Sequence, residues 1–317
     1  MIGADMSTKQ RGKSQALGIV MLLGTALIWG TAFVAQSLGI DVIGPFSFNA
    51  MRTLMGATVL LPVIIIKDAF FLKKASPAEV EAYKVANRKV IGYGIKLGVV
   101  FCVAQNLQQL AFLSSTAGKI AFITSLYMFF VPFIGLFVGK RIPLLTWISV
   151  FLAFAGLYFL SINPQDLTAI NRGDVLTFIC AIFFAFHILL IERFSPEVDP
   201  IKLSAMQFLT SGTISAVLMV LFENPTPEGI RSVIGPLLYS GVMSCGIAYT
   251  FQIIGQSRTE ATAASLIMSL EAVFAVIAAW IILHERLTFR EGLGCVIMFC
   301  AILLSQAGGL IQNRKGS

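Results

Sequence analysis

Ten long apolar runs dominate this sequence of 317 residues. Each run has roughly 19 to 24 residues, which is enough for an α-helix to cross a hydrocarbon core about 30 Å thick. Hydrophobic residues make up 57% of the chain and charged residues only 12%, whereas about a quarter of the residues of a soluble domain are charged. The sequence therefore predicts an all-α, polytopic membrane protein. It argues against a soluble enzyme, a secreted disulfide scaffold or a disordered chain.

The predicted spans are joined mostly by short connections. The exception is the charged segment 67–89, which we expect to be a loop with a short surface helix. Pro62 and Pro132 lie inside spans, where a proline removes a backbone hydrogen bond and predicts a kink. The ten spans are expected at 17–39, 43–66, 90–113, 118–139, 143–162, 173–191, 201–222, 233–255, 260–283 and 289–311.

Lys and Arg residues are divided unequally between the two sides of the predicted bundle. If the N-terminus lies inside, 16 of the 23 Lys and Arg residues fall on the inner side and five on the outer side, while Arg52 and Lys96 lie within spans. Cytoplasmic loops carry such an excess of Lys and Arg, so we expect both termini in the cytoplasm. The same loops explain the net charge of +7, which therefore does not indicate a nucleic-acid partner.

The cysteines and the short motifs indicate no cofactor. All five cysteines fall within predicted spans and none forms a CxxC pair, so neither a disulfide framework nor a metal site is predicted. The sequence contains no complete phosphate-binding loop, HExxH or GxSxG motif. We therefore expect no cofactor, no metal and no enzymatic activity.

The second half of the sequence repeats the first. In the first two spans of each half, Ala50-Met51 aligns with Ala205-Met206 at an offset of 155 residues. From the third span the offset is 144, which aligns Gln108 with Gln252. The offset changes because the charged segment 67–89 is longer than its counterpart in the second half.

Each repeat contains five spans, an odd number, so the two repeats must lie in the membrane in opposite orientations. We expect the first five-helix repeat at 17–162 and the second, inverted repeat at 173–311. Inverted repeats are typical of transporters in which two halves rock around a site near the midplane of the membrane. An ancient duplication that was retained for packing alone is the alternative.

Polar side chains at membrane depth mark the candidate site, because such groups need partners or a water-filled cavity. In the first span, Trp29 and Gln36 share one helix face, which the repeat maps onto Phe184 and its neighbours. The glutamine side chains at this depth have interhelical hydrogen bonding as their alternative role. For His187, packing or an interfacial position is the alternative. The candidate cavity residues are Trp29, Gln105, Gln108, Tyr127, His187, Tyr249, Gln252 and Glu271.

Two of the charged residues lie deep in predicted spans. Glu271 is about 11 residues, or roughly 16 Å, from the start of its helix, too far to reach water along the membrane normal. Arg52 lies at a similar depth, and the two form an ion pair if their helices touch, because a buried charge requires a partner. The other interpretation makes Glu271 a group that couples protons or binds a substrate amine.

These features together resemble the drug/metabolite transporter superfamily, in its ten-helix subgroup with two EamA-type repeats. The resemblance covers almost the whole chain, and the order and spacing of its short motifs make it specific. It departs from the family at Ala272, where a proline often follows the glutamate, so the kink of the ninth span is in question. The matching segments are 26–31, 48–52, 105–108, 116–118, 124–127, Val131-Pro132, Gly173-Asp174, Glu271 and His284-Glu285-Arg286-Leu287-Thr288.

The resemblance implies a carrier of a plasma membrane or bacterial inner membrane, commonly an exporter of small metabolites such as amino acids. We therefore expect a secondary transporter that works by alternating access, with a small-molecule substrate, the lipid bilayer as its surroundings and protons as the candidate coupling ion. A gated channel is the alternative within transport, and an intramembrane enzyme or receptor is the alternative from another class. A channel requires a continuous polar pore, and an enzyme requires a catalytic constellation.

Overall fold

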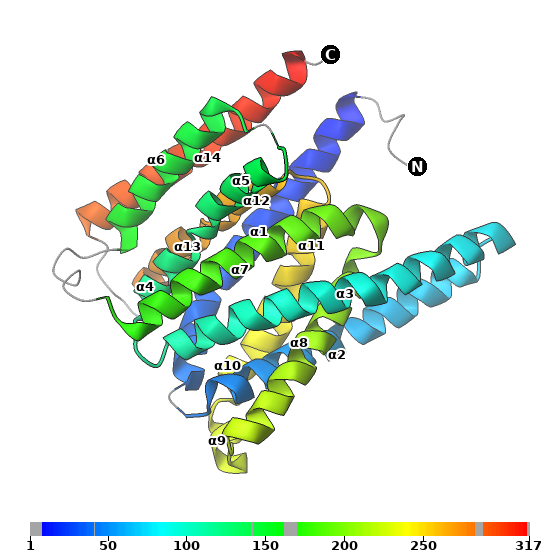
Figure 1. The fold of residues 1–317 in the computed structure, drawn as a ribbon, viewed down its shortest axis with the longest axis horizontal. Coiled ribbons are helices and arrows are strands. Elements are labelled where there is room, and N and C mark those ends of the chain that lie inside the picture. Colours follow the sequence, from blue (N-terminus) through cyan, green and yellow to red (C-terminus); the bar gives the residue numbers. More distant parts are fainter. Residues whose placement is uncertain (1–7, 41, 141, 162–169, 283–287, 316–317) are drawn as a thin grey trace.

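A computed structural model describes residues 8–40, 42–140, 142–161, 170–282 and 288–315, and the regular structure in these ranges is entirely helical (Figure 1). The helices group into ten rods that follow the order of the ten predicted spans. Short helices η2 (Ser195–Glu197) and α9 (Pro227–Ser232) lie in connections. The rods are α1 (Thr8–Ile40), α2 (Pro45–Leu72), α3 (Pro77–Ala111), α4 (Ala117–Thr124) with α5 (Tyr127–Phe137), α6 (Leu144–Ser161), α7 (Arg172–Phe194), α8 (Pro200–Phe222), α10 (Ile234–Leu238) with η3 (Tyr239–Tyr249) and α11 (Thr250–Gln256), α12 (Ala261–Met268) with α13 (Glu271–Ile282), and α14 (Phe289–Lys315).

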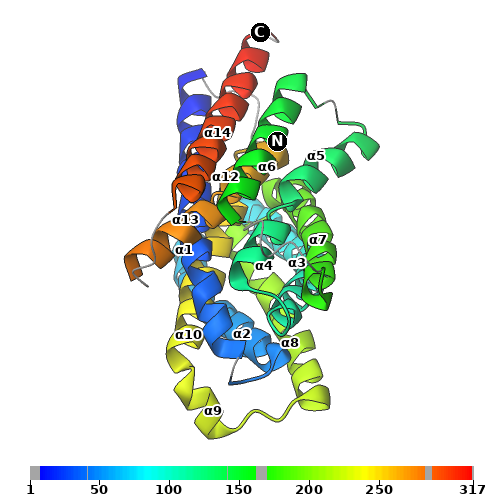
Figure 2. The same ribbon diagram turned by 90° about the vertical axis from the view of Figure 1, so that its left-hand side faces the viewer.

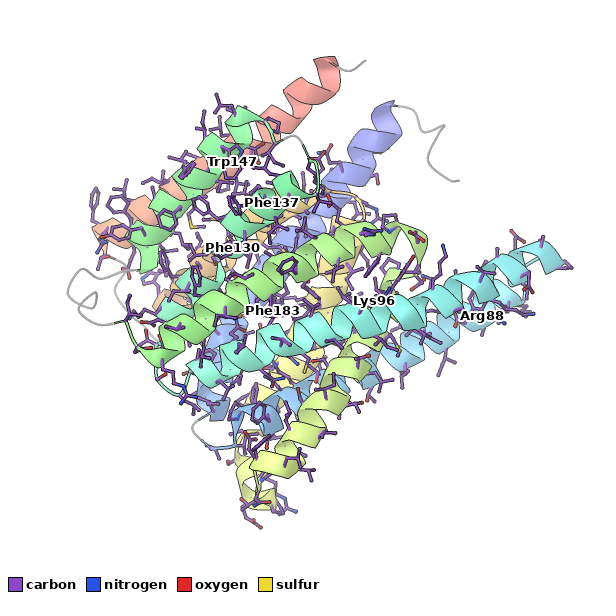
Figure 3. All side chains as sticks on the ribbon, viewed as in Figure 1. Arg88, Lys96, Phe130, Phe137, Trp147 and Phe183 are labelled. Atoms are coloured by element: carbon purple, nitrogen blue, oxygen red, sulfur yellow. The ribbon has the colours of Figure 1, made fainter. Side chains whose placement is uncertain are left out.

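The apolar character of the rods identifies a multi-pass membrane protein. Within the described ranges, eight rods are long and apolar enough to cross a membrane, and α6 contributes a shorter apolar helix. Large apolar side chains also cover the outside of the bundle: Phe137, for example, is 80% exposed (Figure 3). Such a surface is stable in contact with lipid.

The segment 67–89 is not the loop that we expected. Helix α2 continues to Leu72 and α3 begins at Pro77, so only residues 73–76 connect the two helices. The start of α3 is fixed by a capping box, in which the Ser76 side chain accepts a hydrogen bond from the Glu79 backbone N–H and the Glu79 carboxylate accepts one from that of Ser76. Charged residues mark the end of the apolar run here, while the helices continue beyond it. The two helices extend together past the rest of the bundle (Figure 1).

The fourth span of each repeat is interrupted. The break between α4 and α5 lies at Ser125-Leu126, and the break between α12 and α13 lies at Ser269-Leu270. These two dipeptides align at the offset of 144 residues. The second break forms without a proline at position 272, so the departure from the family motif does not remove it. Pro132 lies inside α5 and not at the break.

Contacts between helices occur in matched pairs. Helix α6 packs against α14, and α2 packs against α8, so helices at equivalent places in the two repeats pair with each other (Figures 1 and 2). Helix α1 packs against η3, α11 and α13, and α7 packs correspondingly against α3, α4 and α5. Figure 1 also shows α1 and α7 running in opposite directions. This exchange of contacts is expected of two inverted five-helix repeats.

Small residues allow two of these helices to approach closely. A Cβ atom on Gly156 of α6 would lie 2.9 Å from the Gly294 carbonyl oxygen of α14, and one on Gly294 would lie 2.7 Å from the Gly156 carbonyl oxygen. Because lipid provides no hydrophobic force between helices, membrane helices associate through such close backbone packing. The two glycines therefore hold together the last helices of the two repeats.

The N-terminus of α2 is held by a carboxylate from the second repeat. Glu223 Oε1 accepts a hydrogen bond from the Phe46 N–H at 3.0 Å, and Oε2 accepts hydrogen bonds from the Ser47 N–H at 2.7 Å and the Ser47 hydroxyl at 2.6 Å. A carboxylate at this position also interacts favourably with the helix dipole. Gly44 leaves the necessary space, because a Cβ there would overlap the carboxylate.

We expect Glu223→Ala to lower the free energy of unfolding by about 2 kcal/mol, because three donors lose their acceptor. Thermal or denaturant unfolding of the detergent-purified protein measures the change. Glu223→Gln retains one acceptor oxygen and is expected to lose less, while Glu228→Ala, at an exposed residue of α9, serves as the control. Equal stability of Glu223→Ala and the control would show that the carboxylate does not hold α2.

Candidate functional site

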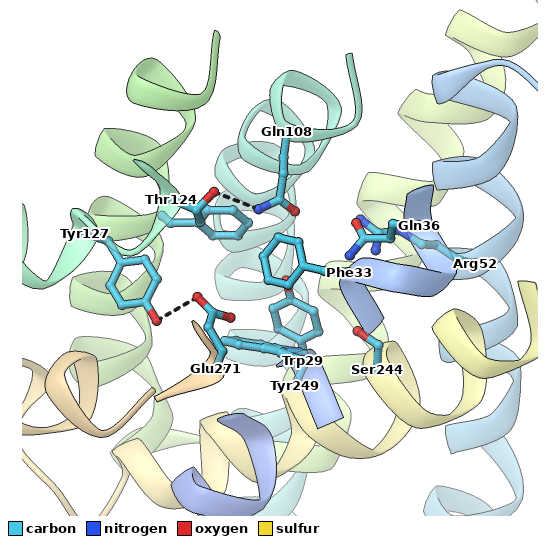
Figure 4. Close-up of a pocket in the computed structure, with 11 residues that line it drawn as sticks. Trp29, Phe33, Gln36, Arg52, Gln108, Thr124, Tyr127, Ser244, Tyr249 and Glu271 are labelled. Carbon is cyan, nitrogen blue, oxygen red and sulfur yellow. Dashed lines mark hydrogen bonds between the residues drawn. The ribbon is translucent and has the colours of Figure 1, made fainter. Parts of the chain in front are cut away.

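A cavity lies where helices of the two repeats meet (Figure 4). Its lining comes from α1, α2, α3, α4, α5, α7, η3 and α13, so both repeats contribute. The empty space between these side chains measures about 360 Å³, open solvent included. The lining residues are Trp29, Phe33, Gln36, Arg52, Gln108, Thr124, Tyr127, Phe184, Ser244, Tyr249 and Glu271.

Aromatic side chains form the central wall of the cavity. The rings of Trp29 and Tyr249, one from each repeat, have centroids 4.5 Å apart and planes inclined by 53°. Phe33 lies one helical turn beyond Trp29 on α1 and faces the same space (Figure 4). Behind the wall, Phe101 packs against Tyr249 with a centroid distance of 4.8 Å. Such rings provide a rigid apolar surface, and Trp and Tyr add a polar edge.

Glu271 forms the acidic side of the cavity. It is the first residue of α13, immediately after the break in the ninth span, and only 3% of it is exposed. Its Oε1 accepts hydrogen bonds from the Tyr127 hydroxyl at 3.2 Å and the Ser125 hydroxyl at 3.4 Å. Tyr127 is the first residue of α5 and therefore aligns with Glu271 in the repeat. The two interrupted spans thus bring their equivalent residues into contact with each other.

Arg52 forms the basic side. This residue of α2 is 2% exposed, and its Nε donates a hydrogen bond to Asn49 Oδ1 at 2.8 Å while Nη2 donates a longer one to Gln105 Oε1 at 3.4 Å. Gln105 is held in turn by a hydrogen bond from its Nε2 to the Ser211 hydroxyl. The polar partners of the guanidinium are therefore neutral amides.

Arg52 and Glu271 do not form the direct ion pair that was one of the two interpretations of the sequence. None of the ion pairs formed among the described residues includes either side chain. Figure 4 shows the two groups on different sides of the cavity, with Phe33 between them. Their helices contribute to the same cavity, but the side chains are held apart by their own hydrogen-bond partners.

Five of the eight predicted cavity residues line this space: Trp29, Gln108, Tyr127, Tyr249 and Glu271. The other three do not. Gln105 lies outside the lining and accepts a hydrogen bond from the Arg52 guanidinium. His187 is fully buried, with its Nε2 at 2.8 Å from Gln207 Oε1 and its ring 5.3 Å from that of Phe101, so it has a packing position. Gln252 is 1% exposed and lies outside the lining.

The predicted set missed several lining residues. Gln36 and Phe184 belong to the helix faces that the sequence indicated, but they were not selected as cavity residues. Thr124, which accepts a hydrogen bond from Gln108 Nε2 at 3.1 Å, directly precedes the first break. Ser244 lies five residues before Tyr249 in η3, which is π-helical. A search at α-helical spacing does not connect residues five apart, and π-helical segments often occur at functional sites.

Two lining residues carry buried polar atoms without a hydrogen-bond partner in the part of the chain that the structure describes. These atoms are Trp29 Nε1, which can only donate, and Gln36 Oε1, which accepts. A buried polar group that lacks a partner destabilises the protein by about 1–3 kcal/mol. A polar ligand in the cavity can supply the missing partners.

The cavity belongs to a protein with a clear family signature. The model of the EamA-like transporter family matches the chain twice, at residues 16–162 and 171–306. The chain belongs to the EamA-like transporter family. This family is a branch of the drug/metabolite transporter superfamily. Its two matches cover nearly all of the two halves of the chain. The EamA-type segment His284-Glu285-Arg286-Leu287 lies outside the described residues.

Relatives that are named as transporters align with this EamA-like protein over most of their length. An uncharacterized transporter of Archaeoglobus fulgidus is 30% identical and aligns over 91% of this chain and 84% of its own. The threonine/homoserine exporter RhtA of Escherichia coli K12 is 24% identical over 94% of this chain and 92% of its own. A solved crystal structure that is 17% identical has a TM-score of 0.70 and covers 95% of this chain and 99% of the other, so it shares the fold.

Proposed function

We propose that this EamA-like transporter exports a small polar metabolite, of the amino acid class, by alternating access around the cavity. The observation that carries the proposal is a cavity between the two repeats, which combines an aromatic wall with one buried acid and one buried base. Inverted-repeat transporters bind their substrates in this position. RhtA, with which the chain aligns over 94% of its length, is named a threonine/homoserine exporter, which supports amino acids as the first candidates.

Alternating access in this proposal is a rocking of the two repeats about the interrupted spans. Ion pairs link the first repeat to α7 at the two ends of the fourth span. Lys119 pairs with Asp174 at 2.7 Å near the start of α4, and Lys140 pairs with Glu192 beyond the end of α5. If the protein lies in a plasma membrane or inner membrane with both termini in the cytoplasm, the Lys119–Asp174 pair is on the non-cytoplasmic side and the Lys140–Glu192 pair is on the cytoplasmic side. Opening one side then requires the pair on that side to separate.

A carrier is favoured over a gated channel by the distribution of polar groups. The cavity is bordered by fully buried apolar side chains such as Phe101 and Met128, which belong to the same hydrophobic cluster as Trp29, Tyr127 and Tyr249 of its lining. A channel needs a polar path that is continuous across the membrane.

Counterflow in liposomes tests the function. Purified protein is reconstituted, the vesicles are loaded with one unlabelled amino acid at a time, and the entry of radiolabelled threonine or homoserine is followed. We expect flux that saturates with concentration and is accelerated by the internal amino acid. A flux that does not saturate, or an ionic conductance, would favour the channel. Repeating the assay with and without a pH gradient tests protons as the coupling ion.

A further inference from the structure

We infer that the cavity recognises a zwitterion, with Arg52 binding the carboxylate of the solute and Glu271 binding its ammonium group. The carbon atoms between the two charges pack on the aromatic wall of Trp29, Phe33 and Tyr249 (Figure 4). This inference rests on the proposed function. It adds the charge pattern of the substrate and the residue that binds each end.

The first argument is the charge balance of the cavity. Arg52 and Glu271 are both almost completely buried and both line the same space, but in the described part of the chain neither takes part in an ion pair. A buried charge that lacks a counter-charge is strongly unfavourable. A solute with one positive and one negative group compensates both charges at once, whereas a singly charged solute leaves one of them unpaired.

The second argument is the free hydrogen-bonding capacity of the guanidinium. Its planar fork carries five N–H donors and matches a carboxylate in a two-pronged arrangement. The described contacts occupy two of these donors, and the one to Gln105, at 3.4 Å, is long for a hydrogen bond. Asn49 and Gln105 thus orient the guanidinium without neutralising it.

The carboxylate of Glu271 has matching free capacity. Both hydrogen bonds that it receives, from Tyr127 and Ser125, end on Oε1. Its Oε2 accepts none from the described residues, which leaves it available to an ammonium group. The two hydroxyl groups hold the carboxylate in place without supplying a positive charge.

The unpartnered atoms of the lining extend the same pattern. Trp29 Nε1 is a donor without an acceptor, and Gln36 Oε1 is an acceptor without a donor among the described residues. In Figure 4 the Gln36 side chain lies beside Arg52. A hydroxyl group on the solute can satisfy either atom, so a hydroxylated zwitterion gains more than a purely aliphatic one.

Matched ligands test the inference on the unmodified protein. Threonine is compared with 1-aminopropan-2-ol, which lacks the carboxylate, and with N-acetylthreonine, which lacks the ammonium charge. A second series, 4-aminobutanoate, butylamine and butanoate, places the two charges farther apart. Dissociation constants are measured by the change in tryptophan fluorescence in detergent, since Trp29 lines the cavity. We expect the zwitterion of at least one series to bind about tenfold or more tightly than both of its singly charged analogues.

Two variants assign the ends of the ligand. Arg52→Gln should abolish the preference for the zwitterion over the amine, while Glu271→Gln should abolish the preference over the N-acetylated or acidic analogue. Arg88→Gln and Glu81→Gln, at exposed residues of α3, are the matched controls and should bind as the wild type does. If Arg52→Gln does not fold, Arg52→Lys replaces it. Lysine keeps the positive charge but lacks the planar fork of N–H donors, so this variant should prefer the zwitterion over the amine less strongly than the wild type does.

The outcomes separate this inference from the transport function. Singly charged analogues that bind as tightly as the zwitterion in both series would overturn the zwitterion site, and so would variants that weaken all ligands of a series equally. If neither zwitterion binds but another solute gives saturable flux in liposomes, the charge pattern is wrong and the transporter remains. If no solute binds or is transported, the proposed function itself fails, together with the site.

Discussion

Replacing Glu271 by glutamine is expected to reduce amino acid counterflow about a hundredfold while leaving the protein folded. Glutamine has nearly the same shape, and its amide oxygen can still accept the hydrogen bonds from Tyr127 and Ser125. The negative charge, in contrast, is lost. Hydrogen bonds to charged groups contribute about 1.5–3 kcal/mol, and a hundredfold change corresponds to about 2.8 kcal/mol. The measurement is the initial rate of entry of the amino acid that gives the largest flux.

A second variant separates the charge from its positioning. Tyr127→Phe removes one hydroxyl from Glu271 Oε1 and leaves the carboxylate in the cavity, so the expected loss of rate is smaller, about tenfold or less. Glu81→Gln, exposed at the start of α3, controls for the loss of a negative charge as such. If Glu271→Gln retains more than half of the wild-type rate, the buried carboxylate has no part in transport.

The apolar runs predict the number and order of the helices because membrane depth imposes a minimum length on each span. They do not predict where helices end outside the membrane. At 67–89 the charges stop the apolar run, but the capping box of Ser76 and Glu79 and the ion pairs of Lys67 with Asp199 and Lys202 with Asp68 stabilise helices beyond it. Local hydrogen bonds, and not hydropathy, set those boundaries.

The repeat predicts more about the site than the composition does. Aligning Tyr127 with Glu271 places both at the same point of inverted repeats, and the structure brings them into contact at 3.2 Å. The helix breaks beside them have no proline or glycine to announce them, since Ser125-Leu126 and Ser269-Leu270 are compatible with a continuous helix. Their interruption depends on the packing of the surrounding helices, which a single sequence does not contain.

Depth in the membrane is readable from the sequence, but lateral position is not. Arg52 and Glu271 were expected at similar depths, and both do line the cavity. Whether they touch depends on helix rotation and on neighbours such as Asn49, whose amide binds Arg52. The same limit applies to His187, which we expected as a cavity residue with packing as the alternative, and whose ring packs against Phe101 and contacts Gln207.

Substitution of Gly30 by alanine is expected to lower the free energy of unfolding by about 2–3 kcal/mol and to reduce transport at least tenfold. A Cβ at this position of α1 would lie 2.6 Å from the carbonyl oxygen of Glu271 and 2.8 Å from the backbone nitrogen of Ala275. Both are backbone atoms at the start of α13, so the clash cannot be relieved by a side-chain rotation, and overpacking of this kind typically costs about 1–3 kcal/mol. The helices must separate, which displaces Glu271 from the cavity.

The matched control for Gly30 is Gly92→Ala on α3, where nothing lies within 4 Å of the added Cβ. Alanine is more favourable than glycine in an open helical position by about 0.5–1 kcal/mol, so this variant should be as stable as the wild type or more stable. The two substitutions are chemically identical and are expected to change stability in opposite directions, because only one of them lies at the crossing of α1 with the half-helix that carries Glu271. Unfolding transitions and counterflow rates of both proteins measure the difference. If Gly30→Ala unfolds at the same temperature as the wild type and transports normally, close approach of α1 to α13 is not what positions the carboxylate.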